Sequence, residues 1–252
     1  MASLLALVVG ATLPPAAQAD ERGGGLLTVT FDDASRTQYE EGLPIAKELR
    51  IPGTLFVITE KADEAQLKPE AWGMSWDNVA EFRDAGWEIA SHSVSHPMFT
   101  EMPLDRVIRE LEISRSEIEA NVGVRPVTFA SPFGEYNGAV LDLIMERYAY
   151  HVLAYGGTEG RNPNPAVSPR EIGRMNVDKN RSPEDVCNEM EIAARNREWL
   201  VLMFHGFVTE PERFQTSPEA FREILDCAAE LRDSGALRIV TVRQAMELIE
   251  AK

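Results

Sequence analysis

The sequence predicts an α/β fold, a distorted (β/α) barrel of about seven strands that forms a single domain. Short apolar runs alternate with helical patterns along the whole chain after Gly25. Strands that alternate with helices are typical of parallel βαβ units, and about seven of them can close or nearly close a barrel. No repeat, low-complexity linker or change in composition divides residues 26–252. We therefore expect one domain over this range.

The strands are expected where apolar and β-branched runs are bounded by turn-forming residues. Because such runs are short and buried, each is interpreted as one strand of a parallel sheet. The expected strands span residues 26–31, 54–58, 88–91, 127–131, 151–156, 171–177, 200–205 and 238–242.

The helices are expected between these strands, where apolar residues recur at helical spacing. Ser75 precedes an acidic first turn, and Gly86 and Gly123 act as stop signals. Trp76 lies on the apolar face of its helix and is predicted to be in the core. The expected helices span residues 39–50, 75–86, 103–123, 137–148, 182–196 and 217–235.

The charge of the chain excludes some partners. The 252 residues include 41 acidic and 25 basic side chains, for a net charge of -16. Such a surface repels phosphate backbones and anionic headgroups, so we expect no nucleic-acid partner and no binding to a membrane surface. No apolar stretch is long enough for a transmembrane segment. Neutral and cationic partners are compatible with this charge.

The N-terminus predicts export. An apolar stretch from Leu4 to Leu13 is followed by Ala17-Gln18-Ala19, which is typical of a signal peptide over residues 1–19. Residues 20–25 then form a short linker. No Lys or Arg precedes the apolar run, and a disordered or buried N-terminal segment stays open as the alternative. Export to the periplasm or the extracellular space is the expectation.

Two cysteines lie in separate helical segments. Cys187 and Cys227 flank the strand expected at residues 200–205. Neighbouring helices could bring the two thiols together, and an oxidising compartment would allow a bridge. A disulfide and two free buried cysteines are both open at this point.

Chemically capable side chains gather at the carboxyl ends of the expected strands. Asp32 and Asp33 follow the first strand, His92 and His96 follow the third, and His205 ends the seventh. In barrels and open parallel sheets, sites are built at this end of the sheet. The pattern therefore predicts one shared site.

Two imidazoles and a carboxylate form a common ligand set for Zn²⁺ or Fe²⁺. His92 and His96 are spaced so that one turn can direct both rings at one point. Two adjacent aspartates repel each other, and a metal relieves this by binding one and leaving the other as a base. Ser91, Ser93 and Ser95 are expected to support the histidines.

These residues resemble the motifs of the polysaccharide deacetylase family, whose catalytic unit is the NodB homology domain (carbohydrate esterase family 4). "TFDDA" is similar to T-F-D-D-G, "HSVSH" to H-[ST]-x-x-H, and "SPFGEYN" and "LVLMFHG" to the third and last motifs. The likeness covers nearly all of residues 26–252. It implies a NodB-like distorted barrel and a divalent metal, most often Zn²⁺, with Co²⁺, Ni²⁺ or Mn²⁺ as alternatives.

The resemblance also implies residue roles. It assigns Asp33, His92 and His96 as metal ligands, Asp32 as catalytic base and His205 as catalytic acid. These types suit hydrolysis of an amide, in which a metal polarises the carbonyl, a base takes a proton from water, and an acid protonates the leaving amine.

Further residues are expected around the substrate. The third motif points to the backbone N–H of Phe133 as an oxyanion donor. Met203 shares the inward face of its strand with His205 and is expected to line a pocket for the acetyl methyl group. Trp72 and Tyr136 are expected to stack on sugar rings.

The chain departs from the family pattern in three places. Ala130 stands where many members carry an arginine that holds the catalytic base, and the first motif ends in Ala34 instead of glycine. The fourth motif, D-x-x-D-W, is absent. Arg174 is the predicted replacement for the missing charge, because strand alternation directs it toward the site. His151 matches no motif and is expected to be structural.

The predicted function is removal of acetyl groups from polysaccharides that contain N-acetylglucosamine: poly-N-acetylglucosamine, a chitin-like chain or peptidoglycan. The "FASPFGEYN" form of the third motif resembles that of deacetylases acting on poly-β-1,6-N-acetylglucosamine. Hydrolysis of a cyclic imide or formamide, acetylxylan O-deacetylation and non-catalytic sugar binding are the alternatives. A groove of exposed aromatic side chains would favour a polymer, and a closed lid would favour a small substrate.

Overall fold

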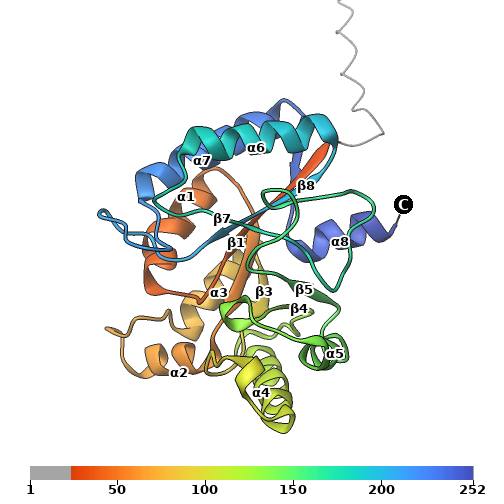
Figure 1. Ribbon diagram of the computed structural model, residues 1–252. Helices are drawn as coiled ribbons and strands as arrows, with labels where there is room; N and C mark the ends of the chain where they lie inside the picture. The colour runs from red at the N-terminus through yellow and green to blue at the C-terminus, as the bar shows by residue number, and fades with distance from the viewer. Residues whose placement is uncertain (1–23, 252) are drawn as a thin grey trace, which may run out of the picture.

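The computed structural model describes residues 24–251, which form one sheet curled into an open barrel with helices around it (Figure 1). The main path of the sheet has the order β5-β4-β3-β2-β1-β8-β6, while β7 pairs with β8 and β9 pairs with β1. The predicted fold class is confirmed. The strands are β1 Gly25–Phe31, β2 Gly53–Val57, β3 Glu88–Ser91, β4 Thr128–Ala130, β5 Tyr150–Val152, β6 Arg161–Asn162, β7 Met175–Asn176, β8 Trp199–Phe204 and β9 Leu237–Ile239.

All six expected helices form, although the first begins with a π-helical turn at Gln38–Gly42. Two helices, α2 and α8, were not expected. None of the helices within residues 24–251 is long and apolar enough to cross a membrane. The helices are α1 Leu43–Glu48, α2 Thr59–Leu67, α3 Trp76–Asp84, α4 Leu104–Val122, α5 Gly138–Met145, α6 Pro183–Asn196, α7 Pro218–Asp233 and α8 Val242–Glu250, with 3₁₀ turns at Phe99–Glu101 and Pro132–Gly134.

Local signals explain several element ends. The Ser75 side chain forms a capping box with Asn78 at the start of α3, and Gly123 adopts a φ of 74° at the end of α4. Thr241 and Gln244 form a second capping box that begins α8. The strand expected at residues 238–242 is therefore shorter than predicted, because its last residues start a helix.

Two expected strands are also much shorter than predicted. The strand expected at 151–156 ends at Val152, and only Met175–Asn176 of the 171–177 strand pairs as β7. Glycines explain this difference. A Cβ on Gly173 would lie 2.4 Å from the carbonyl carbon of Gly156, so the two segments cross with their backbones in contact.

Packing in the hydrophobic core holds β1 at the centre of the sheet. Every residue of β1 is buried, and Phe31 at its end packs against Trp87 and Phe207 with ring centroids 4.6 and 5.2 Å apart. Burying one such side chain stabilises the fold by about 1.5–3 kcal/mol. This packing holds the backbone directly before Asp32. Trp76 is buried as expected.

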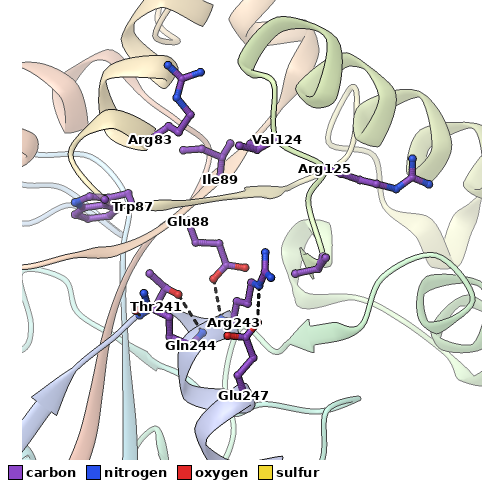
Figure 2. A pocket seen from close by; sticks show the side chains of 12 residues that line it. Arg83, Trp87, Glu88, Ile89, Val124, Arg125, Thr241, Arg243, Gln244 and Glu247 are labelled. Atoms are coloured by element: carbon purple, nitrogen blue, oxygen red, sulfur yellow. Dashed lines mark hydrogen bonds and ion pairs between the residues drawn. The ribbon is translucent and has the colours of Figure 1, made fainter.

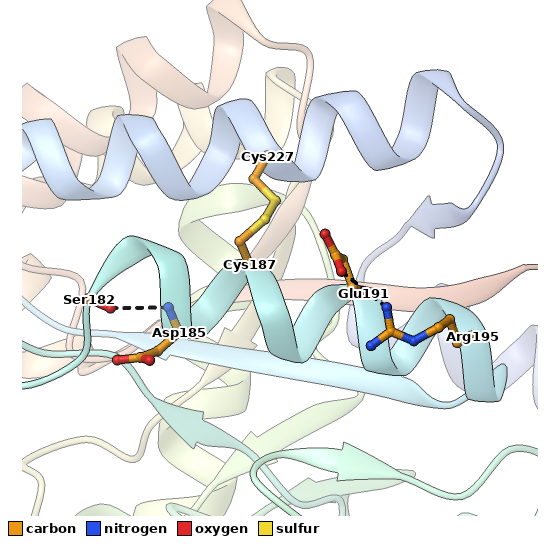
Figure 3. Close-up of a disulfide and its surroundings, with 6 residues drawn as sticks. All are labelled: Ser182, Asp185, Cys187, Glu191, Arg195 and Cys227. Carbon is orange, nitrogen blue, oxygen red and sulfur yellow. Dashed lines mark hydrogen bonds and ion pairs between the residues drawn. A yellow bond between two sulfur atoms is a disulfide. The ribbon is translucent and has the colours of Figure 1, made fainter.

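The two cysteines form a disulfide between α6 and α7, which lie side by side along the barrel (Figure 3). The Cα atoms of Cys187 and Cys227 are 6.1 Å apart, and 40 residues separate them in sequence. A crosslink that closes such a loop contributes about 2–4 kcal/mol to stability. The expected signal peptide, residues 1–19, lies outside the described residues, and the final residue of the expected linker, Gly25, already belongs to β1.

Candidate active site

Three side chains at the carboxyl ends of β1 and β3 converge on one point. The Nε2 atoms of His92 and His96 are 3.2 Å apart, and they lie 3.4 and 3.7 Å from Oδ1 of Asp33. Ligands at 2.0–2.2 Å from a tetrahedral metal lie about 3.4 Å from one another. These residues form the one group of metal-ligating side chains of this kind among residues 24–251. Their spacing fits a single divalent metal ion.

The backbone and its neighbours set the directions of the two histidines. Nδ1 of His92 bonds to the carbonyl of Ala130 at 2.8 Å, which leaves Nε2 facing the site. The backbone N–H of His96 donates to Oγ of Ser93, and the carboxylate of Glu110 accepts from two N–H groups of the turn and from the Ser95 hydroxyl. The serines therefore shape the turn and do not orient the rings.

The protonation of the cluster indicates where a cation belongs. Burial opposes a charged Asp33, but the hydrogen bond and attraction of His92, with the attraction of His205 and His96, outweigh burial and lower the pKa of Asp33 to about 2. Burial also opposes a charged His92, yet its bond to Asp33 raises its pKa. Burial and repulsion from His92 lower the pKa of His96 to about 4. A proton on His92 thus disfavours a second proton on His96, and a bound metal ion would compete with the proton on His92.

Asp32 lies beside this cluster and is held by Arg174. The guanidinium donates to both carboxylate oxygens, at 2.6 and 2.9 Å, and the side chains of Arg174 and Asp32 are only 1% and 4% exposed. Burial by itself would raise the pKa of Asp32, but the attraction and hydrogen bonds of Arg174, together with the attraction of His92 and His205, outweigh burial and lower this pKa. The structure thus places Arg174 where strand alternation predicted. A bidentate charge pair fixes both the ionisation and the orientation of the carboxylate.

A residue that the sequence did not point to connects the ends of β1 and β8 at the candidate site. The buried Gln38 side chain donates from Nε2 to the backbone carbonyls of Asp32 and His205, at 2.7 and 2.6 Å. Its Oε1 accepts from the N–H of Ser35. Gln38 therefore holds the end of β1 against the end of β8. Its position before an expected helix carried no sign of this role.

One cavity of about 490 Å³ contains the predicted base, the three metal-ligand residues and His205. Nδ1 of His205 is buried without a hydrogen-bond partner among the described residues. Trp72 and Tyr136 do not line the cavity; Trp72 is 56% exposed, and the Tyr136 hydroxyl bonds to Glu171. The remaining lining residues are Ser131, Phe133, Gly134, Ala154, Tyr155, Arg174, Met203, Arg213 and Phe214.

Strained backbone concentrates at this cavity. Nine described non-glycine residues have positive φ, and four of them, Asp33, His96, Phe133 and Phe214, line it. Such conformations cost of order 1–3 kcal/mol each and persist where the surroundings hold them. Ala34 also has a φ of 52°, which explains why the family motif usually has glycine at this position.

A further cavity, at the amino-terminal ends of the strands, is lined by the half-buried Glu88 (Figure 2). Its carboxylate accepts hydrogen bonds from Thr54, Thr128 and the backbone N–H of Arg243 in the first turn of α8. Burial raises the pKa of Glu88 against the effect of these bonds. This end of a barrel serves stability rather than catalysis, and Glu88 ties α8 to β3.

His151 is buried behind the third motif, as expected for a structural residue. Its Nε2 bonds to Oγ of Ser131 at 2.9 Å and its Nδ1 to the carbonyl of Arg170 at 2.7 Å. Burial lowers the pKa of His151 to about 4. The neutral ring supports the segment that carries Phe133.

Comparison with known proteins agrees with this architecture. The family model described as "Polysaccharide deacetylase" matches residues 19–152, which is more than half of the chain. The chain therefore belongs to the polysaccharide deacetylase family. A curated relative, the uncharacterized protein YlxY of Bacillus subtilis (strain 168), is 32% identical over 83 residues. That match spans 32% of this chain and 26% of the relative's length.

Solved structures share the fold. The Xyl-CE4 domain of a multidomain xylanase from the hindgut metagenome of Trinervitermes trinervoides has a TM-score of 0.62 and 20% identity, with 89% of this chain and 91% of that chain covered. The peptidoglycan deacetylase PdaC from Bacillus subtilis has a TM-score of 0.58 and 20% identity, with 90% and 92% covered. At these identities the likeness concerns the fold.

Proposed function

We propose that the protein is a metal-dependent N-deacetylase of polysaccharides that contain N-acetylglucosamine. The observation that carries this proposal is the buried ion pair of Asp32 with Arg174 beside the Asp33, His92 and His96 cluster. A carboxylate that is kept ionised next to a metal site, with an imidazole in the same cavity, suits hydrolysis of an acyl bond.

The chain's own groups divide the work of hydrolysis. Asp33, His92 and His96 would hold the metal, which when bound polarises a carbonyl and acidifies water. Asp32 accepts the proton of the attacking water at its carboxylate, because Arg174 keeps that carboxylate ionised and oriented. His205 donates a proton to the leaving nitrogen.

Two further residues position the acetyl group in this proposal. The backbone N–H of Phe133 stabilises the oxyanion that develops at the carbonyl. Met203 of β8 lines the cavity, is only 2% exposed and lies two residues before His205, and in this proposal its thioether contacts the acetyl methyl group. An acetyl group is small enough to reach this depth, whereas the rest of a glycan stays at the mouth.

A polymer is favoured over a small amide because aromatic side chains are exposed at the mouth of the cavity. Phe133 and Tyr155 line it and are 59% and 61% exposed. Such rings can pack against the apolar faces of sugars. We also propose export of the chain, and the disulfide between Cys187 and Cys227 supports it, because disulfides persist in oxidising compartments.

Release of acetate tests the proposal. The protein, loaded with Zn²⁺, is incubated separately with β-1,4- and β-1,6-linked N-acetylglucosamine oligomers, peptidoglycan, acetylated xylan, a cyclic imide and a formamide. We expect acetate from at least one N-acetylglucosamine substrate and a loss of release after chelation. Release from xylan alone would identify an O-deacetylase, hydrolysis of the imide or formamide alone a small-substrate enzyme, and no hydrolysis at all would overturn the proposal.

A further inference from the structure

The paired part of β1 and β8 stops directly before the active-site cavity. Phe31 and Phe204 form the last register pair of the two strands, and the backbone N–H of Asp32 donates to the carbonyl of Phe204 at 3.0 Å. Asp32 and His205 are therefore the first residues beyond the paired strands. Because these residues are the proposed base and acid, the contacts that hold their backbones also set the distance between the two groups.

One buried amide joins the two strands where the pairing stops. The side-chain NH₂ group of Gln38 donates to the carbonyl oxygens of Asp32 and His205, at 2.7 and 2.6 Å, and Gln38 is 0% exposed. A primary amide has two donor hydrogens, so a single side chain can satisfy both carbonyls. Gln38 thus holds the backbone of the base and the backbone of the acid through one group.

The orientation of this amide is fixed by its other bonds. Oε1 of Gln38 accepts from the backbone N–H of Ser35 at 3.0 Å, and the backbone N–H of Gln38 donates to the Ser35 carbonyl at 3.1 Å. A flipped amide would direct its oxygen at two carbonyls and its NH₂ group at an N–H, which would leave buried polar groups without partners. The neighbouring Thr37 adds a second contact to the same loop, since its Oγ1 accepts from the backbone N–H of Phe207 at 3.0 Å.

The base and the acid depend on Gln38 to different degrees. The Asp32 carboxylate is also held by the two hydrogen bonds from Arg174, so its direction does not rest on Gln38. Nδ1 of His205 has no hydrogen-bond partner among residues 24–251, and the ring lies against Phe214 with 5.5 Å between the centroids. A ring without a hydrogen bond at Nδ1 follows its backbone, so the place of the acid is set by the bond from Gln38.

We propose that Gln38 is a positioning residue for the catalytic acid and keeps the His205 ring within reach of the leaving nitrogen. The inference rests on the proposed function, because it takes His205 as the acid. When the C–N bond breaks, its electron pair takes a proton from the His205 ring, and acetate and a free amine are released. An amine needs this proton to leave, whereas 4-nitrophenolate leaves an ester as the anion. Loss of Gln38 should therefore slow hydrolysis of an amide and spare hydrolysis of such an ester.

The test compares a tetramer of N-acetylglucosamine with 4-nitrophenyl acetate as substrates of the zinc-loaded protein. Values of kcat/KM are measured for the wild type, for Gln38→Met, which keeps the side-chain length without an N–H donor, and for the control Gln244→Met. Gln244 also bonds to a backbone N–H, that of Thr241, but at the start of α8. General acid catalysis contributes about 10²–10⁴-fold, and we expect the ratio of amide to ester to fall about tenfold in Gln38→Met. In Gln244→Met the ratio should stay constant.

An equal loss on both substrates, or a ratio like that of the wild type, overturns the positioning role. A general defect of folding or a displaced base would slow both reactions alike, because both need the fold and the activated water. Thr37→Val removes the acceptor of the Phe207 N–H from a half-buried position. This variant should lower the same ratio, and it serves if Gln38→Met does not fold.

A spectroscopic measurement separates this inference from the proposed function. The ring-proton NMR signals of the four histidines are recorded for the zinc-loaded protein, and the signal of His205 is assigned by its loss in His205→Gln. We expect Gln38→Met to shift or broaden the His205 signal and to leave that of His151 unchanged, and an unmoved His205 signal overturns the inference. If the wild type hydrolyses neither substrate, the proposed function fails, and the His205 signal then decides whether Gln38 positions this ring. The same signal decides if only one of the two substrates is hydrolysed.

Discussion

The ion pair of Arg174 with Asp32 allows the sharpest prediction. Arg174→Ala removes the guanidinium and leaves a carboxylate that is 4% exposed without its counter-charge. Breaking a buried pair on one side costs about 3–5 kcal/mol. For a chain of this size each kcal/mol lowers the Tm by roughly 2–4 °C, so we expect the Tm of Arg174→Ala to fall by about 6–20 °C.

The same change should alter the pH dependence of activity. Arg174 makes the largest contribution among the groups that lower the pKa of Asp32 against the effect of burial, and His92 and His205 add to it. Without Arg174, burial raises this pKa, so the base stays protonated to a higher pH and the acid limb of the kcat/KM profile shifts upward. The variant should keep its metal, because Arg174 contacts none of the three ligand residues.

Two companion variants separate charge from geometry. Arg174→Lys keeps the charge but loses the bidentate fork, so its acid limb should shift less than that of Arg174→Ala. The double variant Asp32→Asn/Arg174→Ala has no unpaired buried charge and should be more stable than Arg174→Ala alone. A wild-type Tm together with an unchanged acid limb in Arg174→Ala would refute the assignment of Arg174 as the residue that holds the base.

Three other predictions concern the metal, the base and the buried histidine. His92→Ala and His96→Ala should each lower bound Zn²⁺ well below one ion per chain in elemental analysis, and full occupancy in both variants would rule out the site. Zn²⁺ loading of the wild type should fall in acid, because the pKa of His92 is raised and a proton then competes with the metal for its imidazole. Asp32→Asn should retain the metal and lose at least about 10²-fold in kcat, whereas the control variant Asp105→Asn on α4 should keep both its metal and its kcat. Turnover of Asp32→Asn near that of the wild type would mean that another group is the base. The pKa of His151 is about 4 in the folded chain against an ordinary value of 6.5, so the unfolded chain binds more protons between these two pH values. This group therefore lowers the free energy of unfolding by about 3 kcal/mol as the pH falls from 6.5 to 4. In urea unfolding, the stability of His151→Gln should depend less on pH by that amount, and a pH dependence identical to that of the wild type would contradict the prediction.

Much of the fold and the centre of the site could be predicted because the signals are local. Apolar periodicity and capping residues such as Ser75 act within one helix or strand, so the elements follow from short stretches of chain. The aspartates at the end of β1 and the histidines after β3 could be placed together because parallel strands end at one edge of a sheet. A local signal also explains one of the errors, since Thr241 begins a helix inside an expected strand.

Only the tertiary structure decided the contacts between residues that are far apart in the chain. Arg174 meets Asp32 across 142 residues and Gln38 meets His205 across 167, and the partner of each depends on which strands lie side by side. The shortened strands around Gly173 likewise follow from a backbone crossing. Alternation could direct the Arg174 side chain inward, but the depth and partners of a buried group are set by the packing of the whole barrel. The sequence thus determined the chemistry that is present, and the fold determined which groups face each other.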